Sequence, residues 1–279
     1  MKIFLIGFGD IARRLASRLV ADGCDVSALR RTAMGESGIR TFRGDCRDEA
    51  LLAEVLAGQE AVVVTLAPDA FTEQSYRDTY EAGARALARV LTAASAPPRQ
   101  VLWVSSTSVY GESDGGWVHE ATPARPQGFS GRSLLAAEDI IRRQPVPAVV
   151  VRFSGIYGPG RTRLVDQVRG GHCAPPRPPQ WSNRIHSEDC AGVLHHLIRR
   201  QRAGKQLAPL YLGTDCEPVP LHEVHQWLAQ RLGVAVVENP DVAMRANRRC
   251  SNTLLLASGY RFIYPTWREG YADLLGCRS

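Results

Sequence analysis

The stretch KIFLIGFGDIA, residues 2–12, joins a short apolar run to the start of an amphipathic helix. Gly7 permits a tight turn after the run, Gly9 lets the backbone approach a pyrophosphate, and Ala12 keeps the helix close to the strand. The helix N-terminus then offers N–H groups and a positive dipole end to phosphates. The stretch predicts a dinucleotide-binding turn, although the same turn can form without a ligand. The residues expected to contact the dinucleotide here are Gly7, Gly9, Asp10 and Ile11.

Buried apolar strands alternate with helical patterns beyond this stretch. The strands are expected at 2–6, 25–29, 61–65, 100–104 and 148–152, with a further short one before Gly44. After the first helix, further helices are expected at 48–57, 72–95 and 130–143. This alternation predicts an α/β fold with a doubly wound parallel sheet and right-handed crossovers.

The composition changes after residue 152. Residues 158–184 are rich in glycine, proline and arginine and are expected to be mostly loop over the carboxyl edge of the sheet. Later elements are expected as helices at 187–200, 221–232 and 252–258, and as a last strand at 209–212. We therefore expect a dinucleotide-binding Rossmann domain at 1–155, with a returning segment at 187–213, and a small substrate cap formed by 156–186 and 214–279.

Two arginines end the second strand, about twenty residues after the glycine turn. An NAD site usually has an acidic residue at this point, which binds the 2′-hydroxyl of the ribose. Arg30 and Arg31 can instead bind a 2′-phosphate through their guanidinium groups. The sequence therefore favours NADP over NAD, and the alternative is that both arginines are solvated surface residues. Asp45, after a third strand, is a candidate for binding the adenine amino group or else a plain turn residue.

The charge balance does not point to a nucleic-acid partner. The 279 residues carry 34 Lys and Arg against 28 Asp and Glu, a formal net charge of +6, and only Lys2 and Lys205 are lysines. The arginines occur singly or in pairs, and no run forms a basic arm. The longest apolar runs are too short to cross a bilayer, and no signal-peptide pattern opens the chain. We expect a cytoplasmic protein with a small-molecule substrate and no nucleic-acid or membrane partner.

Seven cysteines are spread widely along the chain, and no two are in C-x-x-C spacing. This pattern fits neither a disulfide framework nor a zinc site, and it predicts free thiols in a reducing compartment. His222 and His225 can share a helix face, but no matching carboxylate or cysteine set accompanies them. We expect no bound metal, because a site needs three or four converging ligands.

A series of motifs follows along most of the chain, in the order GFGDIA, RGDC, VVVTLAP, VSSTSVYG, RFSGIYGPG and RIHSEDCAGVL. The series resembles the extended short-chain dehydrogenase/reductases, specifically the NAD(P)-dependent epimerase/dehydratase group. The resemblance implies a Rossmann domain with a C-terminal substrate cap, a cofactor along the strand ends, and a homodimer through the helices at 72–95 and 130–143. Further cofactor contacts are expected within these motifs, at Asp45, Cys46, Leu66, Ala67, Ser105 and Phe153.

The usual chemistry of this family needs a Ser or Thr in the SS(T/S)xVYG stretch and the Tyr and Lys of a Y-x-x-x-K motif. The resemblance assigns the Ser/Thr role to Ser106. Ser130 and Leu134 stand at the Tyr and Lys positions, while the nearby Gly131 and Glu138 match the family pattern. A serine hydroxyl is too weakly acidic to replace an activated phenol, and leucine cannot bind ribose hydroxyls. The Y-x-x-x-K motif of this chain is therefore degenerate.

A replacement proton donor has to come from another part of the chain. Tyr157, in the motif IYGPG, and His119, on the loop after Tyr110, are the candidates. The alternative for each is a structural role, in packing for the tyrosine and in ordering a loop for the histidine.

The function that the sequence favours is an NADP(H)-binding oxidoreductase or epimerase/dehydratase-like enzyme with a non-standard proton donor. A small, anionic or sugar-derived substrate is expected, since guanidinium groups in the 158–184 stretch can bind a diphosphate. These groups belong to Arg161, Arg163, Arg169, Arg177 and Arg184. The alternative is a non-catalytic NADP-binding sensor or regulatory protein, in which the cofactor stabilises one conformation.

Overall fold

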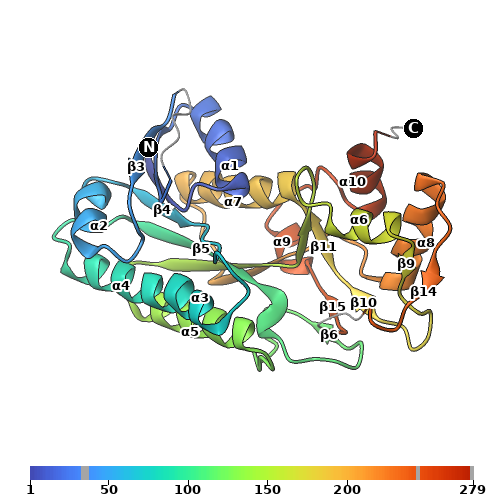
Figure 1. The fold of residues 1–279 in the computed structure, drawn as a ribbon. Helices are drawn as coiled ribbons and strands as arrows, with labels where there is room; N and C mark the ends of the chain where they lie inside the picture. Colours follow the sequence, from blue (N-terminus) through green and yellow to red (C-terminus); the bar gives the residue numbers. More distant parts are fainter. Residues whose placement is uncertain (33–37, 243–245, 277–279) are drawn as a thin grey trace. The chain divides into compact units, whose positions relative to one another are not determined.

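The computed structural model describes residues 1–32, 38–242 and 246–276, and Figure 1 shows its helices and strands. Its largest sheet has seven parallel strands in the order β12-β7-β5-β4-β1-β2-β3. The chain winds outward from β1 in both directions, so the predicted doubly wound parallel sheet of the α/β class is confirmed. The strands are β1 Lys2–Ile6, β2 Asp25–Arg30, β3 Arg40–Arg43, β4 Ala61–Val64, β5 Gln100–Ser106, β7 Ala148–Phe153 and β12 Leu210–Gly213.

The chain divides into two compact units. Unit 1 comprises Met1–Val109, Ala124–Arg152 and Ala191–Tyr211, and unit 2 comprises Tyr110–Pro123, Phe153–Cys190 and Leu212–Ser279. The segment Tyr110–Pro123, which the sequence places in the dinucleotide-binding domain, groups with unit 2. The roles expected for the two regions, cofactor binding and substrate capping, stay predictions.

Helices flank both faces of the sheet in unit 1 (Figure 1). α1 (Asp10–Ala21) and α7 (Ser187–Arg202) lie on one face. α2 (Glu49–Leu56), α4 (Gly83–Ala93) and α5 (Phe129–Arg143) lie on the other. A π-helical turn at Arg77–Ala82 joins α4 to the short helix α3 (Glu73–Tyr76), and a 3-10 turn at Thr107–Val109 follows β5.

The local sequence explains why these elements form. β4 consists of four buried apolar residues, as a strand covered on both faces requires. α1 buries Ile11, Leu15 and Leu19 along one stripe, which packs against the sheet. Asp48 caps α2 by accepting a hydrogen bond from the backbone N–H of Leu51 at 3.0 Å. The apolar core on the α2, α4 and α5 side includes Phe4, Val62, Leu87, Trp103 and Ile141.

Unit 2 combines short strand pairs with helices. Its pairs are β8–β11, β6–β15 and β9–β14, which are parallel, and β10–β13, which is antiparallel. The strands are β6 Trp117–Val118, β8 Gly155–Tyr157, β9 His172–Cys173, β10 Trp181–Ser182, β11 Arg184–His186, β13 Val219–Pro220, β14 Val237–Glu238 and β15 Arg249–Cys250. The helices are α6 Arg163–Arg169, α8 Leu221–Leu232, α9 Thr253–Ala257 and α10 Trp267–Leu274.

Two features of unit 2 differ from the sequence-based expectation. The 158–184 stretch was expected to be mostly loop, but it contains α6, whose Val165 and Val168 are buried one turn apart. The glycine, proline and arginine residues around α6 hide this short apolar spacing. Helix α10 was not predicted, although Thr266 and Glu269 form a capping box at its start, with the Thr266 N–H 2.6 Å from Glu269 Oε2.

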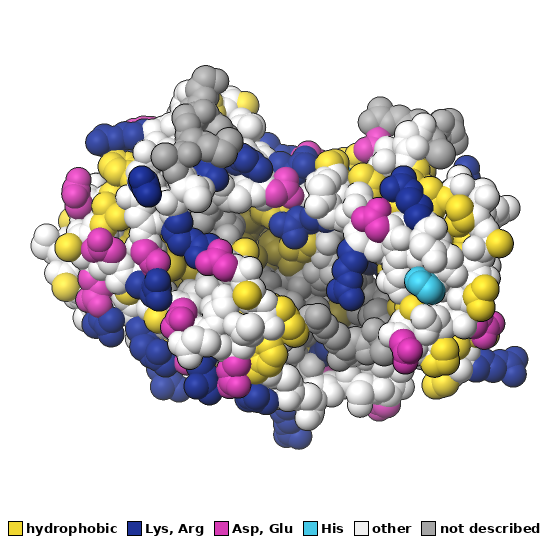
Figure 2. All heavy atoms as spheres, in the orientation of Figure 1, with side chains coloured by type: hydrophobic (Ala, Val, Ile, Leu, Met, Phe, Trp, Pro, Cys, Tyr) yellow, Lys and Arg dark blue, Asp and Glu magenta, His cyan; other side chains and the backbone are white. Residues whose placement is uncertain are grey.

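Charged side chains of both signs are interspersed over unit 1 on the face shown in Figure 2. Several arginines on its helices pair with an acidic residue one turn away, as Arg77 does with Glu73 and Arg85 with Glu81. These arginines are therefore paired locally on helix surfaces and do not form a basic patch of their own.

The described part of the chain contains no helix that is both long and apolar enough to cross a membrane. The cysteines at positions 24, 46, 173, 190, 216 and 250, which lie within this part, form no disulfide bond. Cys277 lies outside the described residues.

A buried histidine holds part of unit 2 together. His225 on α8 is fully buried, and its Nδ1 accepts a hydrogen bond from the Ala174 N–H at 2.8 Å. The pKa of His225 is lowered to about 4, mainly by burial and in smaller part by the charges of Arg184 and His222. The folded chain therefore holds this imidazole neutral at a pH at which an exposed histidine is already charged.

We predict an acid-dependent loss of stability that comes from His225. Between pH 6.5 and about 4 the unfolded chain takes up a proton at this residue and the folded chain does not. The free energy of unfolding should therefore fall by about 1.4 kcal/mol for each pH unit in that window. His225→Asn keeps an acceptor for Ala174 and should remove this slope in urea unfolding, at some cost in stability at neutral pH. The same slope in the variant and the wild type would contradict the assignment.

Candidate functional site

The turn after β1 can be formed only by glycine. Gly7 has φ of +87°, and a Cβ placed on it would lie 2.8 Å from the carbonyl oxygen of Thr65. The Gly7 N–H donates to the Leu29 carbonyl at 3.0 Å, and the Thr65 hydroxyl donates to the Gly7 carbonyl at 2.7 Å. The turn is thus fixed to the ends of both neighbouring strands, β2 and β4.

The start of α1 is open to a ligand. Gly9 is the N-cap residue, no side chain caps the helix, and a Cβ on Gly9 would meet no atom within 4 Å. The first N–H groups of the helix therefore have no side-chain partner at the cap. In the same turn Ala12 is fully buried against the sheet. This open backbone and the positive end of the helix dipole fit a nucleotide pyrophosphate. Asp10 and Ile11 remain expected contacts, and Asp10 Oδ1 accepts from Arg14 Nε at 2.8 Å.

Arg30, at the end of β2, has a partly unsatisfied guanidinium group. Its Nη2 donates to Thr32 Oγ1 at 3.1 Å. Its Nε and Nη1 are buried and have no hydrogen-bond partner in the described part of the chain. Leaving a buried charged donor unpaired is unfavourable, so a bound anion beside these atoms would be stabilising. The residues present therefore fit a nucleotide that carries a phosphate at this end.

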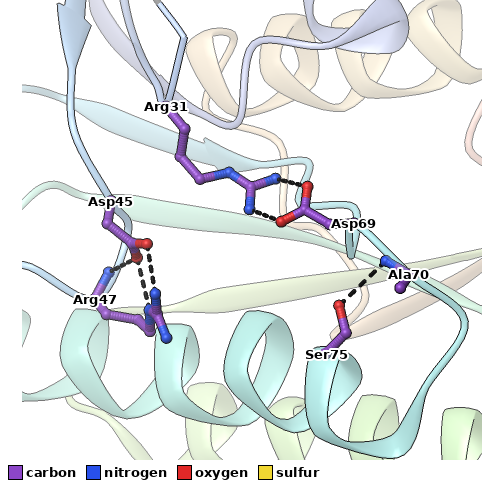
Figure 3. Close-up of polar contacts among 6 residues, drawn as sticks. All are labelled: Arg31, Asp45, Arg47, Asp69, Ala70 and Ser75. Atoms are coloured by element: carbon purple, nitrogen blue, oxygen red, sulfur yellow. Dashed lines mark hydrogen bonds and ion pairs between the residues drawn. The ribbon is translucent and has the colours of Figure 1, made fainter.

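The neighbouring Arg31 is already paired. Figure 3 shows its guanidinium reaching Asp69 on the loop after β4, where both carboxylate oxygens accept hydrogen bonds. The Nη2–Oδ1 distance is 2.6 Å. The hydrogen bond with Asp69 is the main reason that the pKa of Arg31 is raised. Nothing in the sequence pairs these residues, because they are far apart along the chain and only the order of strands brings them together.

Asp45 is held by a different arginine (Figure 3). Its Oδ1 accepts from the N–H and the Nε of Arg47, both at 2.9 Å, and its Oδ2 accepts from Nη2 at 2.8 Å. The hydrogen bond with Arg47 lowers the pKa of Asp45, so the carboxylate is charged. The adenine-binding role stays a prediction, and these contacts favour the turn role as the simpler reading.

Cys46 and Leu66 pack against the same glycine. The Cys46 sulfur and Leu66 Cδ1 would lie 3.1 Å and 3.3 Å from a Cβ on Gly83, at the start of α4. Burial raises the pKa of Cys46 to about 11, so its thiol is protonated. The Leu66 carbonyl accepts from the Tyr80 hydroxyl at 3.3 Å, and Ala67 beside it is exposed.

Ser105 belongs to a buried polar network in unit 1. Its hydroxyl donates to Glu138 Oε1 at 2.6 Å, and the same carboxylate accepts from Arg152 Nη2 at 2.6 Å and Nε at 3.0 Å. All three residues are buried, and the Arg152 and Glu138 side chains are only 5% and 1% exposed. Sequence reasoning treated Ser105 as a cofactor contact and did not find this network. Its hydroxyl proton is already committed to Glu138, so a cofactor contact at Ser105 stays a prediction for its remaining lone pairs.

Ser106 lies at the end of β5 and is half-buried, and its Oγ accepts from the Ser108 N–H at 3.2 Å. Ser130 is half-buried in the first turn of α5. Leu134, one turn later, is 4% exposed. Leu134, which the motif comparison places at the lysine position of the family, is therefore an apolar side chain in the packed part of unit 1.

Tyr157, Phe153 and His119 belong to unit 2. The Tyr157 ring stacks on Tyr271 with centroids 4.3 Å apart, and burial raises its pKa, with Asp215 adding to the shift. Phe153 is buried, and its ring would lie 2.3 Å from a Cβ on Gly213. These contacts favour packing roles for both residues.

His119 is exposed on its loop in unit 2. Its Nδ1 accepts from the Ala121 N–H at 3.2 Å, which leaves the proton of the neutral ring on Nε2. The Tyr110 hydroxyl donates to the His119 carbonyl at 3.0 Å. The loop-ordering role is thus visible in the hydrogen bonds of the His119 carbonyl and of Nδ1, while the Nε2–H of the neutral ring is a hydrogen-bond donor.

The structure gathers the residues expected at the nucleotide end. Asp45 and Cys46 lie close enough to Arg31 to affect its pKa. Gly7 approaches the backbone of both Thr65 and Leu66. The expected catalytic residues are divided between the units, with Ser106 in unit 1 and Tyr157 and His119 in unit 2. Sequence reasoning missed Asp69. The pattern that could have indicated it is an acidic residue a few positions after the buried strand β4, at the edge of the sheet where a cofactor is expected.

Comparison with known proteins shows the same family that the motifs indicate. The model of the NAD dependent epimerase/dehydratase family matches residues 3–213. Protein YeeZ of Escherichia coli K12 is 29% identical over 222 residues, which are 73% of this chain and 75% of YeeZ. A solved structure from Methylobacillus flagellatus, named as an NAD-dependent epimerase/dehydratase, is 36% identical with a TM-score of 0.84, and the match covers 99% of this chain and 97% of that one.

Two further solved structures contain a nucleotide. MoeE5 in complex with UDP-glucose and NAD has a TM-score of 0.80 at 22% identity, over 99% of this chain and 98% of its own. The human epimerase family protein SDR39U1 with NADPH has a TM-score of 0.80 at 21% identity, over 99% of both chains. At these identities the likeness concerns the fold.

We predict that the two glycines of the turn respond differently to a methyl group. Gly9→Ala should leave the free energy of unfolding within about 0.5 kcal/mol, because its Cβ meets no atom within 4 Å. It should weaken NADPH binding about tenfold or more, since the methyl group fills the space that a pyrophosphate needs. Urea unfolding and a fluorescence titration with NADPH measure the two effects.

Gly7→Ala is the matched control for this prediction. Its Cβ would lie 2.8 Å from the Thr65 carbonyl oxygen at φ of +87°, so we expect a loss of roughly 2 kcal/mol or more in stability. A Gly9→Ala variant that binds NADPH as tightly as the wild type would show that no pyrophosphate approaches this turn.

Proposed function

The chain belongs to the NAD-dependent epimerase/dehydratase family, and on that premise we propose that it is an NADP(H)-dependent enzyme acting on a small or sugar-derived substrate. The cofactor part of the proposal rests on unit 1, and the substrate part on the residues of unit 2 and on relatives. The expected homodimer through the helices at 72–95 and 130–143, which correspond to α3 to α4 and to α5, and the expected cytoplasmic location stay predictions.

The observation that carries the cofactor preference is the unsatisfied guanidinium of Arg30. Two of its buried nitrogens lack a partner among the described residues, at the end of the strand where a ribose 2′-substituent is expected. A 2′-phosphate would give these donors charge-assisted hydrogen bonds, which a 2′-hydroxyl supplies more weakly. The structural relatives contain either NAD or NADPH, so the preference for NADP rests on this chain's own residues.

The chemistry that a bound nicotinamide supplies is hydride transfer. Ser106, at the end of β5, is the residue that we assign to hold the reacting substrate oxygen by a hydrogen bond. We assign the proton transfer to His119, whose exposed ring would donate from Nε2 as the imidazolium, with Nδ1 protonated and released from the Ala121 N–H, rather than to the buried Tyr157. A raised pKa and close packing make the Tyr157 phenol a poor donor.

The substrate class is proposed from two kinds of support. MoeE5 binds UDP-glucose, and a curated relative from Streptomyces lividans, 27% identical over 57% of this chain and 53% of its own, is a UDP-glucose 4-epimerase. The exposed Arg161 and Arg177 of unit 2 offer charge for an anionic group. A sugar-derived or other small anionic substrate agrees with both.

A second function is favoured by a specific observation. Leu134 fills the family's lysine position with a buried apolar side chain, and Ser130 fills its tyrosine position. A protein that binds NADP but only senses or transmits its presence needs neither residue. Turnover on a substrate panel decides between the two functions.

We predict that Arg30→Ala weakens NADPH binding by roughly ten- to hundredfold, the range for losing a hydrogen bond to a charged group. NADH binding should change by less than about twofold, because NADH has no 2′-phosphate. Titration of nicotinamide fluorescence measures both affinities. Arg40→Ala is the matched control. Arg40 is an exposed arginine at the start of β3, so it lies away from the carboxyl ends of the strands, and its removal should leave both affinities unchanged. If Arg30→Ala weakens the binding of NADPH and of NADH by the same factor, Arg30 does not bind the 2′-phosphate.

For catalysis, a panel of nucleotide sugars, ketones and aldehydes is assayed with NADPH. Where turnover is found, we predict that His119→Gln lowers kcat by roughly a hundredfold or more, as expected for loss of a general acid. The Kd for NADPH should stay unchanged. Ser106→Ala should also lower kcat in the same assay. If His119→Gln retains full kcat, the proton donor lies elsewhere, and absence of turnover on the whole panel favours the sensor function.

A further inference from the structure

The ion pair between Arg31 and Asp69 joins the two strands that flank β1. Arg31 directly follows β2, and Asp69 lies on the loop between β4 and α3, while β1 lies between β2 and β4 in the sheet. Figure 3 shows the two side chains extended toward each other, with both guanidinium Nη atoms on the carboxylate. The pair therefore bridges the carboxyl ends of the strands on either side of the Gly7 turn, where a dinucleotide is expected.

The bridge is built from exposed charges. The side chains of Arg31 and Asp69 are 51% and 71% exposed. An ion pair this open to water contributes little to stability, and many such pairs contribute nothing measurable. Arg31 can therefore exchange its partner at small cost when a stronger anion is offered.

A phosphate monoester is such an anion. It carries nearly two negative charges at neutral pH and offers three acceptor oxygens, against one charge and two oxygens for a carboxylate. A ribose hydroxyl is neutral and cannot displace a carboxylate that accepts two hydrogen bonds from the same guanidinium. The carboxylate and the phosphate therefore compete for the same guanidinium group of Arg31.

We propose that Asp69 is a positioning residue that sets cofactor selectivity: it holds Arg31 in the nucleotide-free chain and yields it to the 2′-phosphate of NADP(H), but not to the 2′-hydroxyl of NAD(H). The proposal rests on the proposed function, since it needs NADP(H) to bind at the end of β2. It goes further because it assigns a role to Asp69, an acidic residue on the β4–α3 loop. Asp69 competes with the 2′-phosphate for the guanidinium group of Arg31. Because only the phosphorylated cofactor has to break the bridge, Asp69 weakens the binding of NADP(H) and leaves that of NAD(H) nearly unchanged, and so it narrows the preference between them.

The variant that tests the proposal is Asp69→Asn. It removes the negative charge while keeping the shape of the side chain. We expect NADPH to bind roughly two- to fivefold tighter than to the wild type, which is the range that an exposed ion pair can supply. NADH binding should change by less than that, so the ratio of the two dissociation constants shifts. A merely structural role of Asp69 would move both affinities together.

Two further variants make the test specific. Glu49→Gln is the matched control, since Glu49 forms an exposed ion pair with Arg89 elsewhere in unit 1, with side chains 45% and 61% exposed. It should leave both dissociation constants unchanged. In an Arg31→Ala background, Asp69→Asn should have no effect on NADPH binding, because Asp69 acts through Arg31.

The outcomes separate this proposal from the proposed function. If Asp69→Asn weakens NADPH and NADH equally, Asp69 clamps the nucleotide rather than competing with it, and the proposal is wrong. If Arg30→Ala shows the expected loss for NADPH while Asp69→Asn changes nothing, only the role of Asp69 falls. If the folded wild type, checked by its melting transition, binds neither nucleotide, both the role of Asp69 and the proposed function fall.

Discussion

The close approach of three strand ends around residue 7 is the constraint on which the rest of unit 1 depends. A Cβ at Gly7 would lie 2.8 Å from the Thr65 carbonyl oxygen, and the Gly7 N–H and carbonyl are bonded to the ends of β2 and β4. The turn can therefore exist only with glycine, and it leads directly into α1 with an uncapped first turn. Because the loops after β2 and β4 meet the same turn, Arg30, Arg31 and Asp69 come to lie around one end of the sheet. The nucleotide chemistry proposed for the chain follows from this packing.

The sequence was sufficient for the parts of the fold that depend on local pattern. β4 reads as a buried strand because all four of its residues are apolar, and α8 was predicted with the bounds that the structure has. It was insufficient where a signal was short or lay in unusual composition, as in α6 among glycines and prolines. It also could not find the contacts of Asp69 with Arg31 or of Glu138 with Arg152, since strand order and side-chain packing decide them.

In the candidate site, too, local sequence pattern predicts some features and three-dimensional packing decides the others. The glycine turn and the two arginines were found from spacing, whereas their partners were not. Sequence reasoning treated Arg30 and Arg31 as equivalent, but the structure gives one an unsatisfied guanidinium and the other a carboxylate. It also treated Tyr157 and His119 as equivalent, although stacking on Tyr271 and burial set Tyr157 apart. Exposure and hydrogen-bond partners, which no local pattern encodes, make the difference.

We propose that the end of β2 accepts the 2′-phosphate of NADP through Arg30. A crystal structure of the chain grown with NADP⁺ tests it most directly. We expect a 2′-phosphate oxygen within about 3.2 Å of Arg30 Nε or Nη1, the distance of a hydrogen bond. A phosphate that points into solvent while Arg30 still donates only to Thr32, or a nucleotide bound away from the Gly7 turn, would contradict it.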